Sequence, residues 1–103
     1  MPMYLLNLFY SSVREQAAAL KNIRSEIESM SGKQWRVLSA GEHICAIGFV
    51  TELPPEQMRE RLRRSTKSEG LHFLLVEIER PIDGFLTQGT WDWLASHQAA
   101  PRP

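Results

Sequence analysis

Hydrophobic residues recur along this chain with two different periods, and the period changes several times before residue 80. Residues 3–10 are almost continuously apolar, and a run this short is typical of a central strand covered on both faces. Residues 34–39 and 43–50 lie on either side of a turn that contains Gly41, so we predict a hairpin there. Residues 71–79 are apolar at first and acidic at their end, and they form the fourth predicted strand.

Two helices are predicted between these strands, because apolar residues recur there at steps of three and four. Ser12 and Glu15 form a capping box, so we expect the first helix to begin at Ser12 and to end at Gly32. The prolines at 54–55 predict the start of a second helix that continues to about Thr66. The inward-facing residues are expected to be Val13, Ala17, Leu20, Ile23, Ile27 and Met30 in the first helix, and Met58 and Leu62 in the second.

This order of elements predicts an α+β fold of the ferredoxin-like type, β-α-β-β-α-β. We expect an antiparallel four-stranded sheet with two helices on one face and an aromatic C-terminal extension. Residues 1–80 are assigned to the ferredoxin-like core, 81–98 to the extension and 99–103 to a frayed tail. Many unrelated functions share this fold, so the fold by itself does not determine the chemistry.

Composition narrows the class of protein. The 103 residues leave room for one compact domain, and the formal net charge is zero, which argues against a surface built as a whole to attract nucleic acid or anionic lipid. The single cysteine, Cys45, is typical of a reducing compartment. No apolar run reaches the length of about 20 residues that spans a bilayer. We therefore expect a cytoplasmic protein with no membrane contact.

The extension is rich in the aromatic residues that are enriched at protein interfaces. The residues predicted to form a homodimer contact are Phe85, Leu86, Trp91, Trp93 and Leu94. Phe85 and Leu86 would extend the partner's sheet by strand addition. The alternative is that these side chains fold back and cover the bare face of their own sheet, and the two arrangements do not exclude each other.

A basic cluster lies on and just after the second predicted helix. It consists of Arg59, Arg61, Arg63, Arg64 and Lys67, and of these Arg59, Arg63, Arg64 and Lys67 are the candidates for contact with nucleic acid phosphates. The favoured alternative is a solvated helix face, because Glu56 and Glu60 are interleaved with these arginines as ion-pair partners.

Metal-binding and catalytic patterns are weak. His43 and Cys45 share one face of a strand, but no second pair of ligands has the spacing of a metal site. Glu77 and Glu79 also share a face, and solvent-exposed strand charges explain them more simply. Cys45 lies within an apolar strand, which is unlike the electropositive opening of a reactive cysteine. We expect no bound metal, no cofactor and no catalytic constellation.

Several segments resemble a known family of small ferredoxin-like proteins. They are the apolar strand 3–10, the turn at 40–41, the start of the second helix at 51–54, the strand 73–78 and the Trp-Asp-Trp-Leu run at 91–94. In these segments the chain resembles the CRISPR-adaptation endoribonuclease subunit, the VapD toxins and the SinR-like proteins. The resemblance implies a dimer with paired sheets and a tail that crosses between subunits.

The nuclease members of that family carry a metal-binding aspartate at the end of the first strand. The corresponding residues 7–12 of this chain, Asn-Leu-Phe-Tyr-Ser-Ser, include no carboxylate. Asn7 and Ser11 do not supply the negative charge that a divalent cation requires. This departure argues against a nuclease mechanism.

Three hypotheses for function remain open. The leading one is a small non-catalytic homodimeric interaction or regulatory module that binds another macromolecule, as toxin–antitoxin, phage or defence proteins do. The second is a metal-dependent endoribonuclease that uses Glu77, Glu79 or Asp83 in place of the missing aspartate. The third is a small-molecule binder or a monooxygenase-like protein, with a pocket lined by Trp35, His43, Phe49 and His72.

Overall fold

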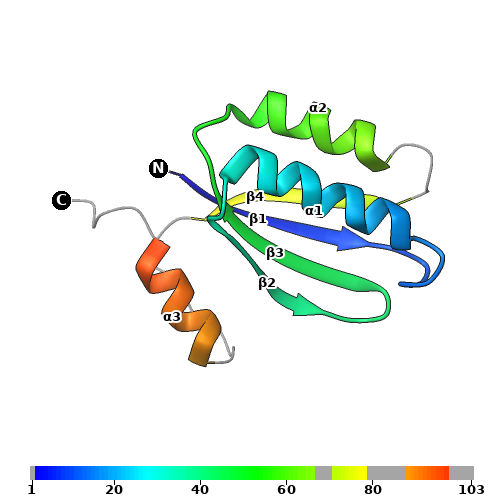
Figure 1. Ribbon diagram of the computed structural model, residues 1–103, viewed down its shortest axis with the longest axis horizontal. Helices are drawn as coiled ribbons and strands as arrows, with labels where there is room; N and C mark the ends of the chain where they lie inside the picture. The colour runs from blue at the N-terminus through cyan, green and yellow to red at the C-terminus, as the bar shows by residue number, and fades with distance from the viewer. Residues whose placement is uncertain (1, 67–70, 79–87, 98–103) are drawn as a thin grey trace.

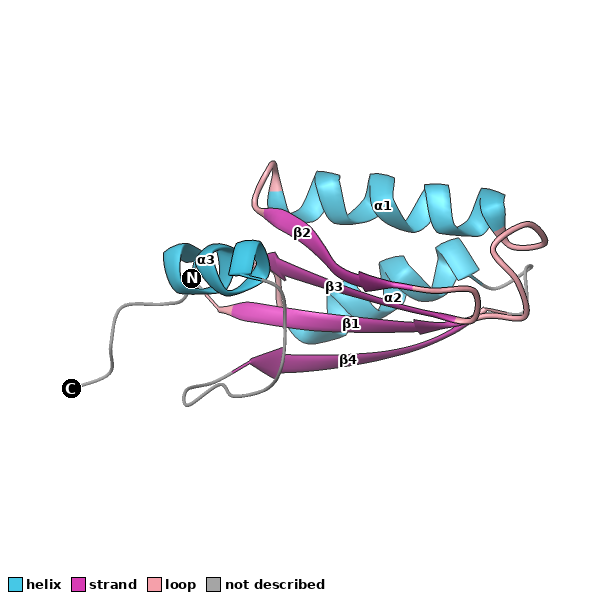
Figure 2. Ribbon diagram, turned by 90° about the horizontal axis from the view of Figure 1, so that it is seen from below, coloured by secondary structure: helices cyan, strands magenta, loops and turns pink. Residues whose placement is uncertain are grey.

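The computed structural model describes residues 2–66, 71–78 and 88–97, and for Thr66, Gln88, Thr90, Trp91 and His97 it describes the backbone only. The elements, in chain order, are β1 (Met3–Phe9), α1 (Ala17–Ser31), β2 (Trp35–Ala40), β3 (Ile44–Val50), α2 (Pro55–Thr66), β4 (His72–Ile78) and α3 (Gln88–His97). Helices α1 and α2 lie on one face of the sheet, and α3 lies at the other face near one end (Figures 1 and 2).

The four strands form one antiparallel sheet in the order β2-β3-β1-β4. Strand β1 is paired on both sides: at its first residue, Met3 is opposite Val50 of β3 on one side and Ile78 of β4 on the other. This topology is ferredoxin-like, so the predicted α+β fold is confirmed.

The main core lies between the sheet and the two helices α1 and α2. Its fully buried side chains come from the inward face of each element: Leu6, Leu8, Ile23, Ile27, Ile47, Phe49, Met58 and Leu62. Full burial of one such side chain contributes about 1.5–3 kcal/mol to stability. The predicted inner residues of α2, and Leu20, Ile23, Ile27 and Met30 of α1, are confirmed.

The start of the first helix differs from the prediction. The Ser12 hydroxyl accepts a hydrogen bond from the Glu15 backbone N–H (3.0 Å), as a capping box requires. However, the Ser12 N–H donates to the side chain of Gln16 (3.0 Å) instead of Glu15, and the Gln16 N–H closes a separate turn onto the Ser12 carbonyl. The regular helix therefore begins only at Ala17. As a result Val13 is 43% exposed and Ala17 is exposed, so their predicted burial was wrong.

Helix α1 ends as predicted, at a glycine with positive φ (Gly32, φ 66°). The end of α1 is tied to the segment that precedes α2 by the buried Thr51. Its hydroxyl donates to the Met30 carbonyl (2.8 Å) and accepts from the Leu53 N–H (3.2 Å). This pair of hydrogen bonds fixes where the chain leaves β3 and turns toward α2.

The C-terminal extension contains the helix α3. Phe85 and Leu86, which are predicted to extend a partner's sheet, lie outside the described residues, as do the predicted frayed tail at 99–103 and the predicted boundary at residue 80. Among residues 2–66, 71–78 and 88–97, no helix combines the length and the apolar character that a membrane-spanning helix needs.

The two-faced sheet gives a direct test of where the core lies. We expect Ile27→Ala to lower the free energy of unfolding by about 2–5 kcal/mol, because it leaves a cavity in the core. Ile44→Ala is the matched control on the exposed face of the sheet and should cost less than about 1 kcal/mol. Urea denaturation of both variants measures this, and equal losses would contradict the assignment of the core.

Candidate functional site

Among the described residues, those of α3 cover one end of the sheet face opposite α1 and α2. There Leu94 of α3 is 2% exposed and packs with Met3 of β1 and Val50 of β3. Trp93 and Ile78 pack against the same small cluster. A second, minor core therefore joins α3 to one end of the sheet.

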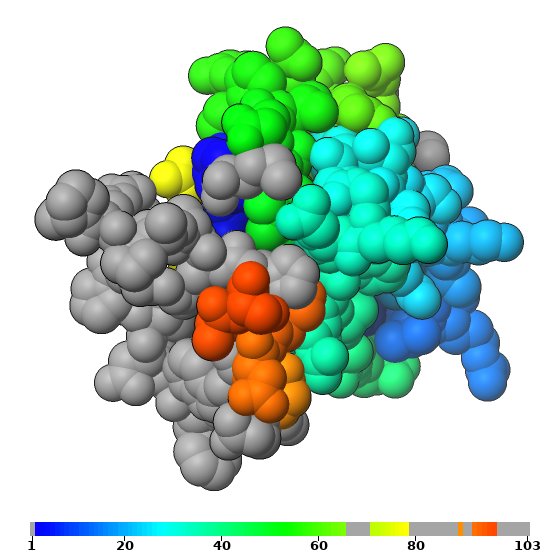
Figure 3. Space-filling view, turned by 60° about the vertical axis from the view of Figure 1, so that its left-hand side comes forward, coloured from blue at the N-terminus to red at the C-terminus, as the bar shows by residue number. Residues whose placement is uncertain are grey.

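Glycine at position 48 lets α3 lie close to the sheet. A Cβ atom placed on Gly48 would be 3.0 Å from Cζ3 of Trp93, so a larger residue would push the indole ring away. The first turn of α3 also approaches β2, because a Cβ on Gly89 would be 3.1 Å from a guanidinium nitrogen of Arg36. In the space-filling view the orange side chains of α3 lie beside the turquoise ones of β2 (Figure 3).

Beyond α3 the same sheet face exposes an apolar strip. We call Phe9, Ile44, Leu74 and Val76, which are 41%, 48%, 55% and 42% exposed, the open-face strip. The register brings these residues together, because Phe9 is opposite Ile44, while Leu74 and Val76 lie on the neighbouring strand β4. Within the described strands β1, β3 and β4, no Asp, Glu, Lys or Arg lies on this face.

Sequence reasoning did not single out this strip as a site. The signal was present, since residues 44–50 and 72–78 carry apolar side chains at both odd and even positions. Such a pattern means that both faces of the sheet are apolar, although only one is covered by α1 and α2. Contiguous exposed apolar surface is typical of an interaction site.

The predicted dimer residues have different outcomes. Leu94 is buried against its own sheet and Trp93 is half-buried there, so the intrachain alternative describes both side chains. Phe85 and Leu86 lie outside the described residues, as does the side chain of Trp91. A role for these residues between subunits stays a prediction.

The arginines of α2 differ in their exposure and in their ion-pair partners. Arg59, Arg63 and Arg64 are exposed, and Arg63 forms an ion pair with Glu60 (3.1 Å) one turn away. The hydrogen bond from Arg63 and its charge lower the pKa of the Glu60 carboxyl. Lys67, the fourth nucleic-acid candidate, lies outside the described residues.

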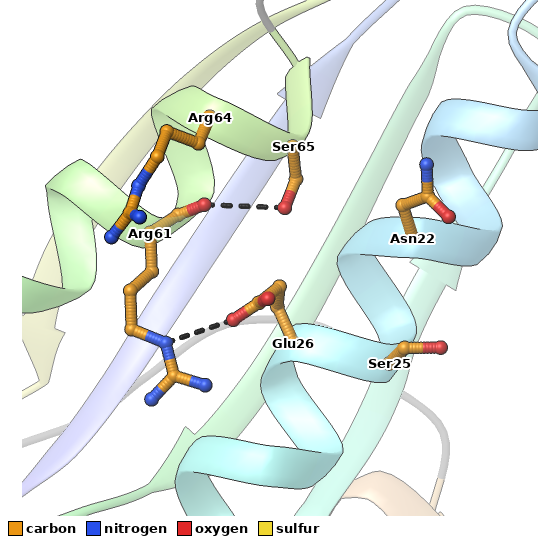
Figure 4. A pocket seen from close by; sticks show the side chains of 6 residues that line it. All are labelled: Asn22, Ser25, Glu26, Arg61, Arg64 and Ser65. Atoms are coloured by element: carbon orange, nitrogen blue, oxygen red, sulfur yellow. Dashed lines mark hydrogen bonds and ion pairs between the residues drawn. The ribbon is translucent and has the colours of Figure 1, made fainter.

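Arg61 and Arg64 line a polar groove between α1 and α2 (Figure 4). The groove has a volume of about 470 Å³ and is lined by Asn22, Ser25, Glu26, Arg61, Arg64 and Ser65. The Arg61 guanidinium donates to Glu26 (2.9 Å) and to the Ser29 hydroxyl (2.9 Å), so its charge is already balanced within the chain. The Arg61–Glu26 ion pair therefore links the two helices, and this balanced charge does not favour the binding of an anion in the groove.

His43 and Cys45 do not form a reactive pair. Cys45 is buried on the core side of β3, and burial raises the pKa of its thiol, while the charge of Arg24 opposes this in part. His43 lies just before β3 with its Nδ1 2.6 Å from the Ser11 carbonyl oxygen. The thiol is therefore held in its protonated, unreactive form.

The residues proposed for the other two hypotheses are not brought together. Trp35 and Phe49 are paired at one end of the sheet, whereas His43 and His72 are next to the opposite end, beside Tyr10 and Phe9. Glu77 is exposed on β4, and Glu79 and Asp83 lie outside the described residues. Over residues 2–66, 71–78 and 88–97, no three His, Cys, Asp or Glu side chains lie close enough to hold a metal ion.

Comparisons with known proteins add similarity of shape only. No family model and no curated protein matches the chain. The C-terminal domain of the MgtC protein from Mycobacterium tuberculosis is 14% identical with a TM-score of 0.49, over 80% of this chain and 95% of that one. The NE2512 protein of Nitrosomonas europaea, of unknown function, is 13% identical with a TM-score of 0.45, over 82% and 95%.

A formyltetrahydrofolate deformylase from Pseudomonas putida KT2440 also matches, at 11% identity and a TM-score of 0.46. The match covers 74% of this chain and 28% of the deformylase chain. At these identities and TM-scores the likeness carries nothing about activity or partners. The resemblance to the CRISPR-adaptation family stays a prediction.

The protonated state of Cys45 predicts how its reactivity depends on pH. Because burial raises its pKa, we expect the folded protein to react with a thiol reagent only at higher pH than the unfolded chain does, and slowly at pH 8. The measurement is the modification rate from pH 7 to 10, with and without urea. Equal rates in both states would contradict a buried thiol and would reopen a nucleophilic role for Cys45.

Proposed function

We propose that this protein is a small non-catalytic interaction module that acts as a homodimer and binds another macromolecule. The observation that carries the proposal is the open-face strip, in which four large apolar side chains are between 41% and 55% exposed. At about 25 cal/mol per Å² of apolar surface removed from water, covering such a strip favours association. No charged side chain of β1, β3 or β4, as far as these strands are described, opposes an apolar partner on this face.

The chemistry of the strip supports a protein as the bound macromolecule. Nucleic acid is bound mainly through cations that neutralise phosphates. Here the formal net charge is zero, and Arg61 and Arg63 already have carboxylate partners within the chain. Arg59 and Arg64 remain exposed on α2, on the opposite side of the sheet from the strip, so nucleic acid is the second candidate.

The homodimer is tested by light scattering. We expect a mass of about twice 11.8 kDa at micromolar concentration, because a chain this short gains substantial burial from a second copy. A mass of about 11.8 kDa over the whole concentration range would contradict the homodimer.

The class of partner is tested with a charge placed in the strip. We expect a protein captured from cell extract, once purified, to bind the wild type at least about tenfold more tightly than it binds Ile44→Glu, because a desolvated carboxylate is costly. Val13→Glu is the matched control, since Val13 is also exposed but lies outside the strip. Equal affinity for the two variants would contradict a role for the strip.

Nucleic acid is tested by titrating the protein into labelled single- and double-stranded RNA and DNA at low and physiological salt. We expect no binding at low salt. Binding that falls steeply with salt and weakens in Arg64→Ala would make nucleic acid the partner in place of a protein.

A further inference from the structure

The two edges of the sheet are protected to different degrees. In β2 the register shifts between Val37 and Ser39, and such a bulge makes an edge strand a poor template for a further strand. Strand β4 pairs with β1 over seven consecutive residues, His72–Ile78, without a bulge, and it contains no proline or lysine. Natural proteins rarely leave an edge of this kind unpaired.

The backbone hydrogen bonds show which groups of β4 face outward. The Tyr10 N–H donates to the His43 carbonyl (3.0 Å), and the Thr51 N–H donates to the Pro2 carbonyl (3.3 Å). Even-numbered residues along β1 therefore exchange hydrogen bonds with β3. Because bonding alternates along an antiparallel strand, the odd-numbered residues of β1 direct their N–H and C=O groups toward β4.

The register of β1 and β4 shows which residues of β4 bond to β1. Leu5 and Asn7 are opposite Val76 and Leu74, so even-numbered residues of β4 bond to β1. The backbone groups of Phe73, Leu75 and Glu77 consequently face away from the sheet. They form a row of donors and acceptors along the outer edge.

A groove lies beside this edge. It has a volume of about 360 Å³ and lies between α2 and β4, lined by Pro55, Glu56, Arg59, Phe73, Leu74 and Leu75. Its walls are apolar on the β4 side and carry one positive and one negative charge on the α2 side. This arrangement fits a strand whose side chains are apolar at the centre and acidic toward one end, which is the pattern of β4 itself.

We propose that two copies of this chain pair antiparallel through their β4 edges, with Leu75 on the two-fold axis. This assignment rests on the proposed homodimer and specifies its surface. Centring the pair on Leu75 uses all of His72–Ile78 and matches the outward groups of Phe73, Leu75 and Glu77 with those of Glu77, Leu75 and Phe73 in the second copy. A pair centred on Glu77 would be shorter and would oppose two like charges.

The register also places unlike charges together. Glu77 of the second copy lies opposite Phe73, and Arg59 lines the same groove as Phe73, together with Glu56. On the open face, Leu74 lies opposite Val76 of the second copy, so the two open-face strips become one continuous apolar surface. The dimer thus doubles the surface offered to a third molecule and leaves α3 in place.

The register is tested by disulfide cross-linking of mixed variants. In the proposed pair, positions 74 and 76 of the two copies are directly opposite and not hydrogen-bonded, with Cα atoms about 4.5 Å apart, which a disulfide can bridge. Positions 74 and 74 are diagonal neighbours, about 7–8 Å apart. Both side chains are about half exposed, so Leu74→Cys and Val76→Cys should fold normally.

With oxidised glutathione, we expect the mixture of Leu74→Cys and Val76→Cys to form covalent dimers at least about tenfold faster than either variant alone. Wild type is the control, because its only cysteine, Cys45, is buried. Light scattering of the same samples before oxidation separates the outcomes. A dimer that shows no preference for the mixture contradicts pairing of two copies through β4. The homodimer would then use another surface, and a peptide strand would be the candidate partner for β4. A monomer overturns both.

Charge reversal gives an independent readout of the same pair. We expect Arg59→Glu to weaken dimerisation by up to about fivefold, the range of an exposed ion pair, and Glu77→Arg in the same chain to restore it. Rescue by the second substitution requires the two residues to meet. Additive losses would contradict the register.

Discussion

Strand β1 is apolar on both of its faces, and the arrangement of the remaining chain follows from that constraint. Leu6 and Leu8 on one face are covered by α1 and α2, which supply Ile23, Ile27, Met58 and Leu62. Met3 on the other face is covered by Leu94 of α3. Phe9 is left 41% exposed, because α3 reaches only one end of the sheet. One strand thus requires two covering layers, and the described chain supplies one and a part of the second.

The incomplete layer explains why the favoured function is binding and not chemistry. Chemistry in a small domain needs polar groups that converge in a place protected from water. Here several of the described polar groups stabilise the scaffold. Arg61 joins α2 to Glu26 of α1, and the Thr51 hydroxyl ties the end of α1, at Met30, to the segment that precedes α2. The large side chains that β1, β3 and β4 expose on the open face are mainly apolar, and another macromolecule is the natural cover for them.

The fold could be predicted from periodicity, because each element has its own apolar pattern and the order of elements leaves few topologies. The start of α1 could not, since Ser12 has the sequence of a cap but Gln16 competes for its N–H. The strip was missed for a different reason. Leu74 and Val76 read as interior residues in the sequence, and their exposure depends on how far α3 reaches across the sheet, which no local pattern encodes.

The two surfaces that the described part of the chain leaves uncovered meet at β4. Leu74 and Val76 belong to the open-face strip, and among the described strands the same β4 forms an edge of the sheet without a bulge. Burial of the strip alone would not select β4 as the contact strand, because β1 and β3 contribute apolar side chains to the strip as well. An edge strand without bulge, proline or lysine offers backbone hydrogen bonds in addition to the apolar contact. These hydrogen bonds are directional, so they select one register and one partner. A second copy pairs the backbone groups of this edge, because β4 is complementary to itself when antiparallel, with Leu74 opposite Val76 and Phe73 opposite Glu77. The edge therefore orders the dimer, and the strip remains available to the molecule that the dimer binds.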